Sequence, residues 1–94
     1  MARVELSAAA VEDLRDLIAT HELPADTPAR VARSLRPLDR FPEIGVALTG
    51  RWSGMRFLLG PWRWMLLIYV VLDERVVVVT IQDARASAAP TAER

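Results

Sequence analysis

The chain has 94 residues, of which 52% are hydrophobic and 26% charged; this suits one small globular domain over residues 1–94 and excludes an intrinsically disordered protein. Twelve basic residues balance twelve acidic ones, which disfavours nucleic-acid binding through bulk positive charge. The absence of cysteine excludes disulfides, thiolate metal sites and cysteine nucleophiles. The longest apolar run, residues 64–72, is far shorter than the roughly 20 residues of a membrane-spanning helix, so we expect a cytoplasmic protein.

The first half of the sequence predicts a short strand followed by two helices. Residues 3–6 alternate polar and apolar side chains, as strands do. Ser7 is a good N-cap for a helix over residues 8–20, where apolar side chains recur at helical spacing. The Thr-Pro pair at residues 27–28 predicts the start of a second helix, with the threonine as its cap. Pro37 should kink or end that helix, because proline removes a helical hydrogen bond.

The second half predicts a three-stranded antiparallel meander. Residues 55–59, 62–72 and 75–82 are rich in aromatic and β-branched side chains. Only residues 60–61 and 73–74 separate these strands, and such short connections indicate hairpins. The expected fold class is therefore α+β: an N-terminal strand and two helices packed on an antiparallel sheet with a C-terminal three-stranded meander.

Three arginines in the middle of the chain have no acidic residue near them in sequence. Arg51, Arg56 and Arg63 are the charged residues of the segment 46–72. If the first hairpin loop has two residues, Leu58 pairs with Arg63, and Arg56 and Arg63 point to the same face of the sheet as diagonal neighbours. Two arginines on an otherwise apolar face are a plausible clamp for a phosphate group.

The positions of two other candidate residues follow less directly from the sequence. A two-residue turn at residues 73–74 places Arg85 opposite Trp62, whereas a three-residue turn places it opposite Arg63, and both remain open. His21 is the one histidine and falls in an expected loop without a candidate partner, so we expect no catalytic role for it. We also expect no metal or cofactor, because there is no metal-ligand spacing and no glycine-rich phosphate loop.

The motifs of the second half occur in a characteristic order. Residues 55–63 (Met-Arg-Phe-Leu-Leu-Gly-Pro-Trp-Arg) precede a long strand, an acidic turn at 73–74 and the valine-rich residues 76–81. This arrangement resembles the RelE/ParE superfamily, the small toxins of type II toxin–antitoxin modules, and the resemblance extends over residues 3–87. It implies a cognate antitoxin protein as partner, and as target either the ribosome with its messenger RNA or DNA gyrase.

The resemblance also implies roles for individual residues. Members that cleave messenger RNA on the ribosome hold the scissile phosphate with basic residues of the sheet. In-line attack by a 2′-hydroxyl builds negative charge on the phosphate oxygens, which fixed guanidinium groups would stabilise. The roles implied are catalysis by Arg56, Arg63 and Arg85, RNA binding by Arg51 and Trp62, and antitoxin binding by Trp52.

Two features of the cleaving members are missing from this sequence. Leu58 stands where they often have a second basic residue, and no tyrosine or histidine follows Ile81 to assist proton transfer. The tail from Ala86 onward is small and polar, which is typical of a frayed end. Because a missing general acid or base costs typically about 10²- to 10⁴-fold in rate, any cleavage should be slow. We therefore expect a ribosome-dependent mRNA endoribonuclease toxin, with a ParE-like gyrase inhibitor or a domain that retains only antitoxin binding as alternatives.

Overall fold

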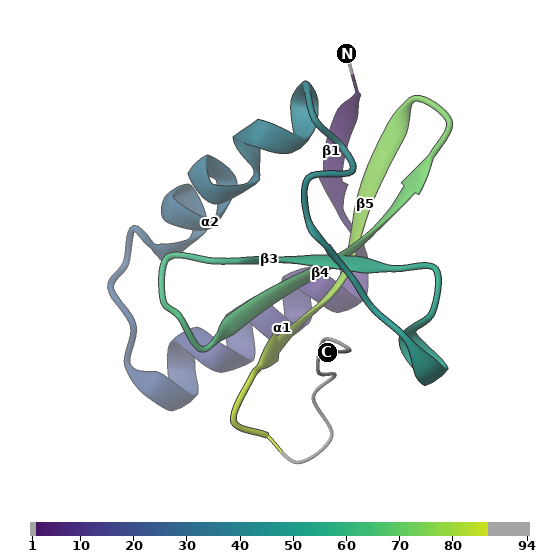
Figure 1. Cartoon of the computed structure of the whole chain (residues 1–94). Coiled ribbons are helices and arrows are strands. Elements are labelled where there is room, and N and C mark those ends of the chain that lie inside the picture. The colour runs from purple at the N-terminus through teal and green to yellow at the C-terminus, as the bar shows by residue number, and fades with distance from the viewer. Residues whose placement is uncertain (1, 87–94) are drawn as a thin grey trace.

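A computed structural model describes residues 2–86 and shows two helices packed on one face of a five-stranded sheet (Figure 1). The elements are β1 (Arg3–Leu6), α1 (Ala8–His21), α2 (Thr27–Leu35), β2 (Val46–Ala47), β3 (Arg56–Leu59), β4 (Met65–Leu72) and β5 (Arg75–Asp83). The strand order is β1-β5-β4-β3-β2. The expected α+β class and C-terminal meander are confirmed, whereas the tail predicted to fray lies almost entirely outside the described residues.

Helix α1 forms where the sequence predicts it and is hydrogen-bonded to the second half of β5. The Ser7 hydroxyl accepts a hydrogen bond from the Ala10 amide (3.0 Å), which is the expected N-cap. One turn later the Asp13 carboxylate accepts from the Thr80 hydroxyl (2.5 Å) and the Ile81 amide (3.2 Å). Strand β1 pairs only with the first half of β5 and does not extend as far as Ile81. The Asp13 carboxylate therefore provides the hydrogen-bond acceptor for the Ile81 amide.

Helix α2 begins at Thr27, one residue earlier than predicted. Thr27 is the first helical residue and is fully buried, and its hydroxyl donates to the Pro24 carbonyl (2.6 Å) instead of capping the helix. Asp26 occupies the cap position and pairs with Arg30 (3.0 Å). Pro37 acts as expected, because α2 ends at Leu35 and continues as a short 3₁₀ turn over Arg36–Asp39.

The sheet is mixed, and one hairpin differs from the expected register. Strand β1 runs parallel to β5, while β2 through β5 pair antiparallel. The turn at residues 73–74 has two residues, because Leu72 pairs with Arg75. Leu58, however, pairs with Leu67 and not with Arg63. The connection between β3 and β4 therefore spans residues 60–64, and the predicted two-residue loop is wrong.

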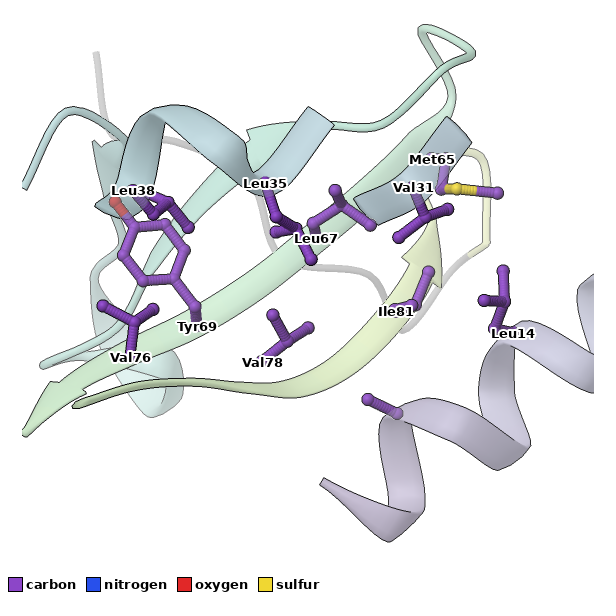
Figure 2. Close-up of a cluster of buried hydrophobic side chains, with 11 residues drawn as sticks. Leu14, Val31, Leu35, Leu38, Met65, Leu67, Tyr69, Val76, Val78 and Ile81 are labelled. Carbon is purple, nitrogen blue, oxygen red and sulfur yellow. The ribbon is translucent and has the colours of Figure 1, made fainter. Parts of the chain in front are cut away.

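Side chains alternate along β4 and build a separate cluster on each face. On the helical face, Met65, Leu67 and Tyr69 pack with side chains of α1 and α2 in the main core (Figure 2). On the other face, Leu66 and Ile68 pack with Leu48 and its neighbours in a smaller cluster. This alternation identifies the face to which every residue of β3 and β4 points. None of the helices within residues 2–86 has both the length and the apolar character needed to cross a membrane.

Candidate functional site

Arg56 lies on the helical face at the start of β3, and its guanidinium is bound to the backbone. Its strand partner is Tyr69, whose side chain is fully buried in the main core. The Arg56 Nη1 atom donates to the carbonyl oxygens of Glu43 (3.1 Å) and Gly45 (2.9 Å). The Tyr69 hydroxyl accepts from the Gly45 amide (2.9 Å), and burial raises the pKa of Tyr69. Both side chains therefore fix the segment that leads into β2.

Arg63 lies at the opposite end of the same hairpin, in the turn between β3 and β4. It is exposed and makes no ion pair or hydrogen bond with its side chain in the described part of the chain. The three residues of β3 that follow Arg56 separate it from this turn by about 10 Å of extended backbone. The predicted diagonal pairing of Arg56 and Arg63 is therefore wrong, and these two arginines do not form the expected clamp. The physical reason is the longer turn, which moves Arg63 off the strand.

Arg85 follows β5 and belongs to a cluster that the sequence pattern does not indicate. Its Nη2 atom lies 2.9 Å from Asp83 Oδ2 and 3.3 Å from His21 Nε2. The guanidinium lies over the ring of Trp64, with 4.9 Å to the ring centroid. His21 stacks on that same tryptophan, with 4.6 Å between ring centroids and 17° between planes. We call His21, Trp64, Asp83 and Arg85 the His21 cluster.

The contacts of the His21 cluster are compatible with either tautomer of the imidazole. Arginine can only donate, so the contact with Arg85 requires His21 Nε2 to accept and places the ring proton on Nδ1, which faces the Leu17 carbonyl at 3.3 Å. When Nε2 is protonated, it can instead donate to Asp83, whose Oδ2 is also 3.3 Å away. The hydrogen bond from Arg85 lowers the pKa of Asp83 to about 2, so Asp83 is an anion near neutral pH. The cluster therefore holds an imidazole between a fixed anion and a fixed cation.

The turn between β3 and β4 connects Arg63 to this cluster. Trp62 and Trp64, on either side of Arg63, lie with ring centroids 6.2 Å apart and planes at 22°. Arg30 of α2 lies over Trp62 at 5.9 Å from the ring centroid. The proposed RNA contact of Trp62 would thus be made by a ring that already packs against an arginine and a second tryptophan. The row of rings brings Arg63 and Arg85 to the same end of the molecule.

Arg51 and Trp52 lie on the other face of the sheet. They form a short 3₁₀ turn over Gly50–Trp52, in which the Arg51 guanidinium is 5.7 Å from the centroid of the Trp52 ring. Trp52 is half-buried against the small cluster of Leu48, Leu66 and Ile68. Trp52 and Trp62 therefore belong to separate surfaces. Within residues 2–86, no three histidine or acidic side chains gather closely enough to hold a metal ion.

The sequence offers only a faint signal for the His21 cluster. His21 and Arg85 are 64 positions apart, and no motif links them. The prediction that His21 has no partner is wrong, because α1 extends one residue further than expected and its last turn brings the imidazole beside the end of β5. The available clue is the Asp-x-Arg spacing of Asp83 and Arg85, since an acid and a base two residues apart can pair across a turn.

Comparison with known proteins adds the likeness of the whole fold. No family model matches the sequence, and no curated protein matches it significantly. Among solved structures, the chromosomal ParDE toxin–antitoxin system of P. aeruginosa has a TM-score of 0.72 at 13% identity, over 90% of this chain and 98% of the other. The toxin–antitoxin complex RelBE2 of Mycobacterium tuberculosis has a TM-score of 0.63 at 23% identity, over 87% and 90% of the two chains. YafQ of E. coli has a TM-score of 0.65 at 16% identity, over 95% and 100%. The chain therefore has the fold of the RelE/ParE-type toxins.

Proposed function

We propose that this chain is the toxin of a type II toxin–antitoxin module and arrests translation by cleaving messenger RNA on the ribosome in the cytoplasm. The fold supports the toxin role, since solved structures that share it include two toxin–antitoxin systems. The observation that carries the cleavage mechanism is the His21 cluster, in which an imidazole, an arginine and an aspartate meet at Trp64, the sequence neighbour of the exposed Arg63. These side chains can stabilise phosphate charge and transfer a proton.

The proposed chemistry is transfer of a phosphate ester within the RNA. The 2′-oxygen forms a bond to the neighbouring phosphorus, and the bond from phosphorus to the 5′-oxygen breaks, which leaves a 2′,3′-cyclic phosphate and a 5′-hydroxyl. The 2′-hydroxyl displaces Arg85 Nη2 from His21 Nε2, and this nitrogen then takes the proton of the 2′-hydroxyl. Water supplies a proton to the departing 5′-oxygen and becomes hydroxide. Arg63 stabilises the charge on the phosphate oxygens, an interaction worth about 2.7 to 4 kcal/mol per donor. Arg85, whose guanidinium is bound to Asp83, lies beside the imidazole and is not a phosphate ligand in this proposal.

This proposal changes which residues act. Arg56 is left out of the reaction, because two backbone carbonyls engage its guanidinium on the helical face. His21 takes the place of the missing C-terminal tyrosine or histidine. RNA binding by Arg51 and Trp62 and antitoxin binding by Trp52 stay predictions. The separation of Trp52 from Trp62 suits a partner that contacts both faces of the sheet.

The deciding experiment is primer extension on ribosome-bound messages after induction of the protein in its bacterial host. We expect new 5′ ends that weaken about 10²- to 10⁴-fold in the His21→Phe variant. Phenylalanine keeps an aromatic ring on Trp64 but cannot transfer a proton, so thermal unfolding should change little. Arg40→Ala is the matched control, because Arg40 is exposed and lies away from the cluster.

The other outcomes identify the alternatives. Growth arrest with intact messages and induction of the DNA-damage response would replace RNA cleavage by inhibition of gyrase. Unchanged growth with folded protein would leave only antitoxin binding. Cleavage that persists in His21→Phe would remove His21 from the mechanism without removing the nuclease.

A further inference from the structure

The segment that leads into β2 exposes three large apolar side chains within six residues. Phe41 is 60% exposed, Ile44 55% and Val46 47%, and they are three of the six exposed large hydrophobic side chains within residues 2–86. A hollow of about 570 Å³ is lined by the residues from Phe41 to Ile44. Exposed apolar side chains that gather in one place mark an interaction surface, whereas single ones need no explanation. We call Phe41, Ile44 and Val46 the Phe41 patch.

Hydrogen bonds hold the backbone of the Phe41 patch in one conformation. Arg56 and Tyr69 bind this segment from the sheet, as described above. Within the segment, the Phe41 amide donates to the Pro37 carbonyl (2.9 Å) and the Ile44 amide donates to the Phe41 carbonyl (3.0 Å). A surface that is already ordered in the free chain loses little conformational entropy when a partner binds. The patch is therefore organised for binding before any partner arrives.

The Phe41 patch and the His21 cluster lie at different ends of the sheet. The patch is anchored at Tyr69, whereas Met65, earlier on β4, pairs with Asp83 of the cluster. Figure 2 shows Tyr69 and Met65 at opposite ends of the main core. Strand β2 is the edge of the sheet, so no strand within residues 2–86 lies beyond Val46. A partner on the patch would leave the His21 cluster open.

The charges beside the Phe41 patch indicate what covers it. Arg40 and Glu43 are exposed, lie on either side of Phe41 in the sequence, and have no ion pair within residues 2–86. A nucleic acid or an anionic membrane would be attracted by Arg40 but repelled by Glu43. A second copy of this chain, related by a two-fold axis, can set each Arg40 against the Glu43 of the other copy. Both charges are then paired while the apolar side chains face one another.

We propose that the Phe41 patch joins two copies of this chain in a two-fold symmetric dimer. Three apolar side chains and two charges from each copy make a small contact, which is typical of a reversible association and not of a permanent one. The dimer forms and separates without RNA, so this inference does not depend on the proposed function. RNA cleavage by a monomer would overturn the dimer alone, and a dimer without cleavage would overturn the nuclease alone.

Sedimentation equilibrium of the purified full chain measures this association. We expect the average mass to rise from that of one chain toward that of two between about 1 μM and about 1 mM. Ile44→Glu should raise the dissociation constant at least about tenfold, because the dimer would bury a carboxylate without a partner. Leu59→Glu is the matched control, since Leu59 is 48% exposed and lies at the other end of β3, and it should associate like the unmodified chain. Circular dichroism confirms that each variant is folded.

An exchange of charges tests the two-fold arrangement. Arg40→Glu and Glu43→Arg should each weaken self-association, because like charges then meet across the axis. When the two variants are mixed, every facing pair is opposite in sign. Each variant should therefore bind the other at least about tenfold more tightly than it binds itself. Fluorescence transfer between differently labelled variants measures this preference.

Four results would overturn the proposal. These are a chain that stays monomeric at about 1 mM, dimers that persist in Ile44→Glu, an equal loss of association in Leu59→Glu, and charge variants that bind each other no better than themselves. A monomeric chain whose antitoxin binding is weakened by Ile44→Glu would assign the Phe41 patch to the antitoxin.

Discussion

The two ends of the β3–β4 hairpin carry the same kind of residue in opposite circumstances. At the strand end, Arg56 donates to two backbone carbonyls beside the buried Tyr69. At the turn end, Arg63 extends from the surface beside two tryptophans and has no partner among the described residues. The two carbonyls hold the Arg56 guanidinium in place through its Nη1 atom, whereas a free guanidinium can turn to form the bidentate contacts that phosphate favours. Position in the hairpin therefore separates a structural arginine from a candidate ligand-binding one.

The largest expected effect is on RNA cleavage at the turn end. Arg63→Ala should lower the cleavage rate about 10²- to 10³-fold, since it removes a donor to transition-state charge. Arg63→Lys should recover only part of this loss, because lysine keeps the charge without the planar fork. Primer extension measures both. Arg56→Met should cleave normally once the amount of folded protein is matched; an equal loss in Arg56→Met would erase the distinction between the two ends.

The largest effect on stability should come from the strand end, at Gly45. A β-carbon there would lie 2.5 Å from the Tyr69 hydroxyl oxygen and 2.7 Å from the Phe57 carbonyl oxygen. Because backbone would have to move, Gly45→Ala should lower the free energy of unfolding by about 3 kcal/mol. Urea denaturation measures this. Gly54→Ala is a steric control, since no atom lies within 4 Å of a β-carbon there, although its positive φ of 91° adds some strain.

A smaller loss is expected from Tyr69→Phe. This change removes the acceptor of the buried Gly45 amide and leaves that amide without a partner. The free energy of unfolding should fall by about 1.5 kcal/mol, in the range found for buried unsatisfied groups. Hydrogen exchange at the Gly45 amide should accelerate in the same variant. Unchanged exchange would mean that the tyrosine does not hold this segment.

The smallest effect concerns pH and the ion pair of the His21 cluster. Arg85 lowers the pKa of Asp83 to about 2 from an ordinary value of 3.8, so the ionised carboxylate stabilises the fold above about pH 4, and this contribution is lost as the pH falls toward 2. Asp83→Asn should cost less than about 1 kcal/mol at pH 7, because Arg85 is largely exposed. We expect urea denaturation between pH 7 and 2 to show that the unfolding free energies of the unmodified protein and Asp83→Asn converge below pH 4. Asp16→Asn is the control, since Asp16 is exposed and has no ion pair in the described chain. If the unfolding free energies of the unmodified protein and Asp83→Asn differ by a constant amount down to pH 2, the pH dependence does not come from the Asp83–Arg85 pair.

Local chemistry in the sequence was enough to predict most secondary structure. Ser7 caps α1, Pro37 ends the second helical segment, and the residues 73–74 form a two-residue turn as expected. Each of these features depends on interactions within a few residues. A hydroxyl reaches the next turn of a helix, proline lacks an amide hydrogen, and a short polar connection reverses a strand.

The candidate site could be identified only from the tertiary structure, because the distances between its side chains depend on the whole sheet. Trp62 and Trp64 stack on each other in the turn over residues 60–64, and this turn places Arg63 away from Arg56. A register shift in β4–β5 beside Tyr69 also changes which residues meet at the end of β5. His21 reaches Arg85 only because α1 is anchored along β5 by Asp13. Contacts between residues more than 60 positions apart leave no periodicity in the chain, so composition and spacing determined the elements, while long-range packing alone decided which charged groups meet.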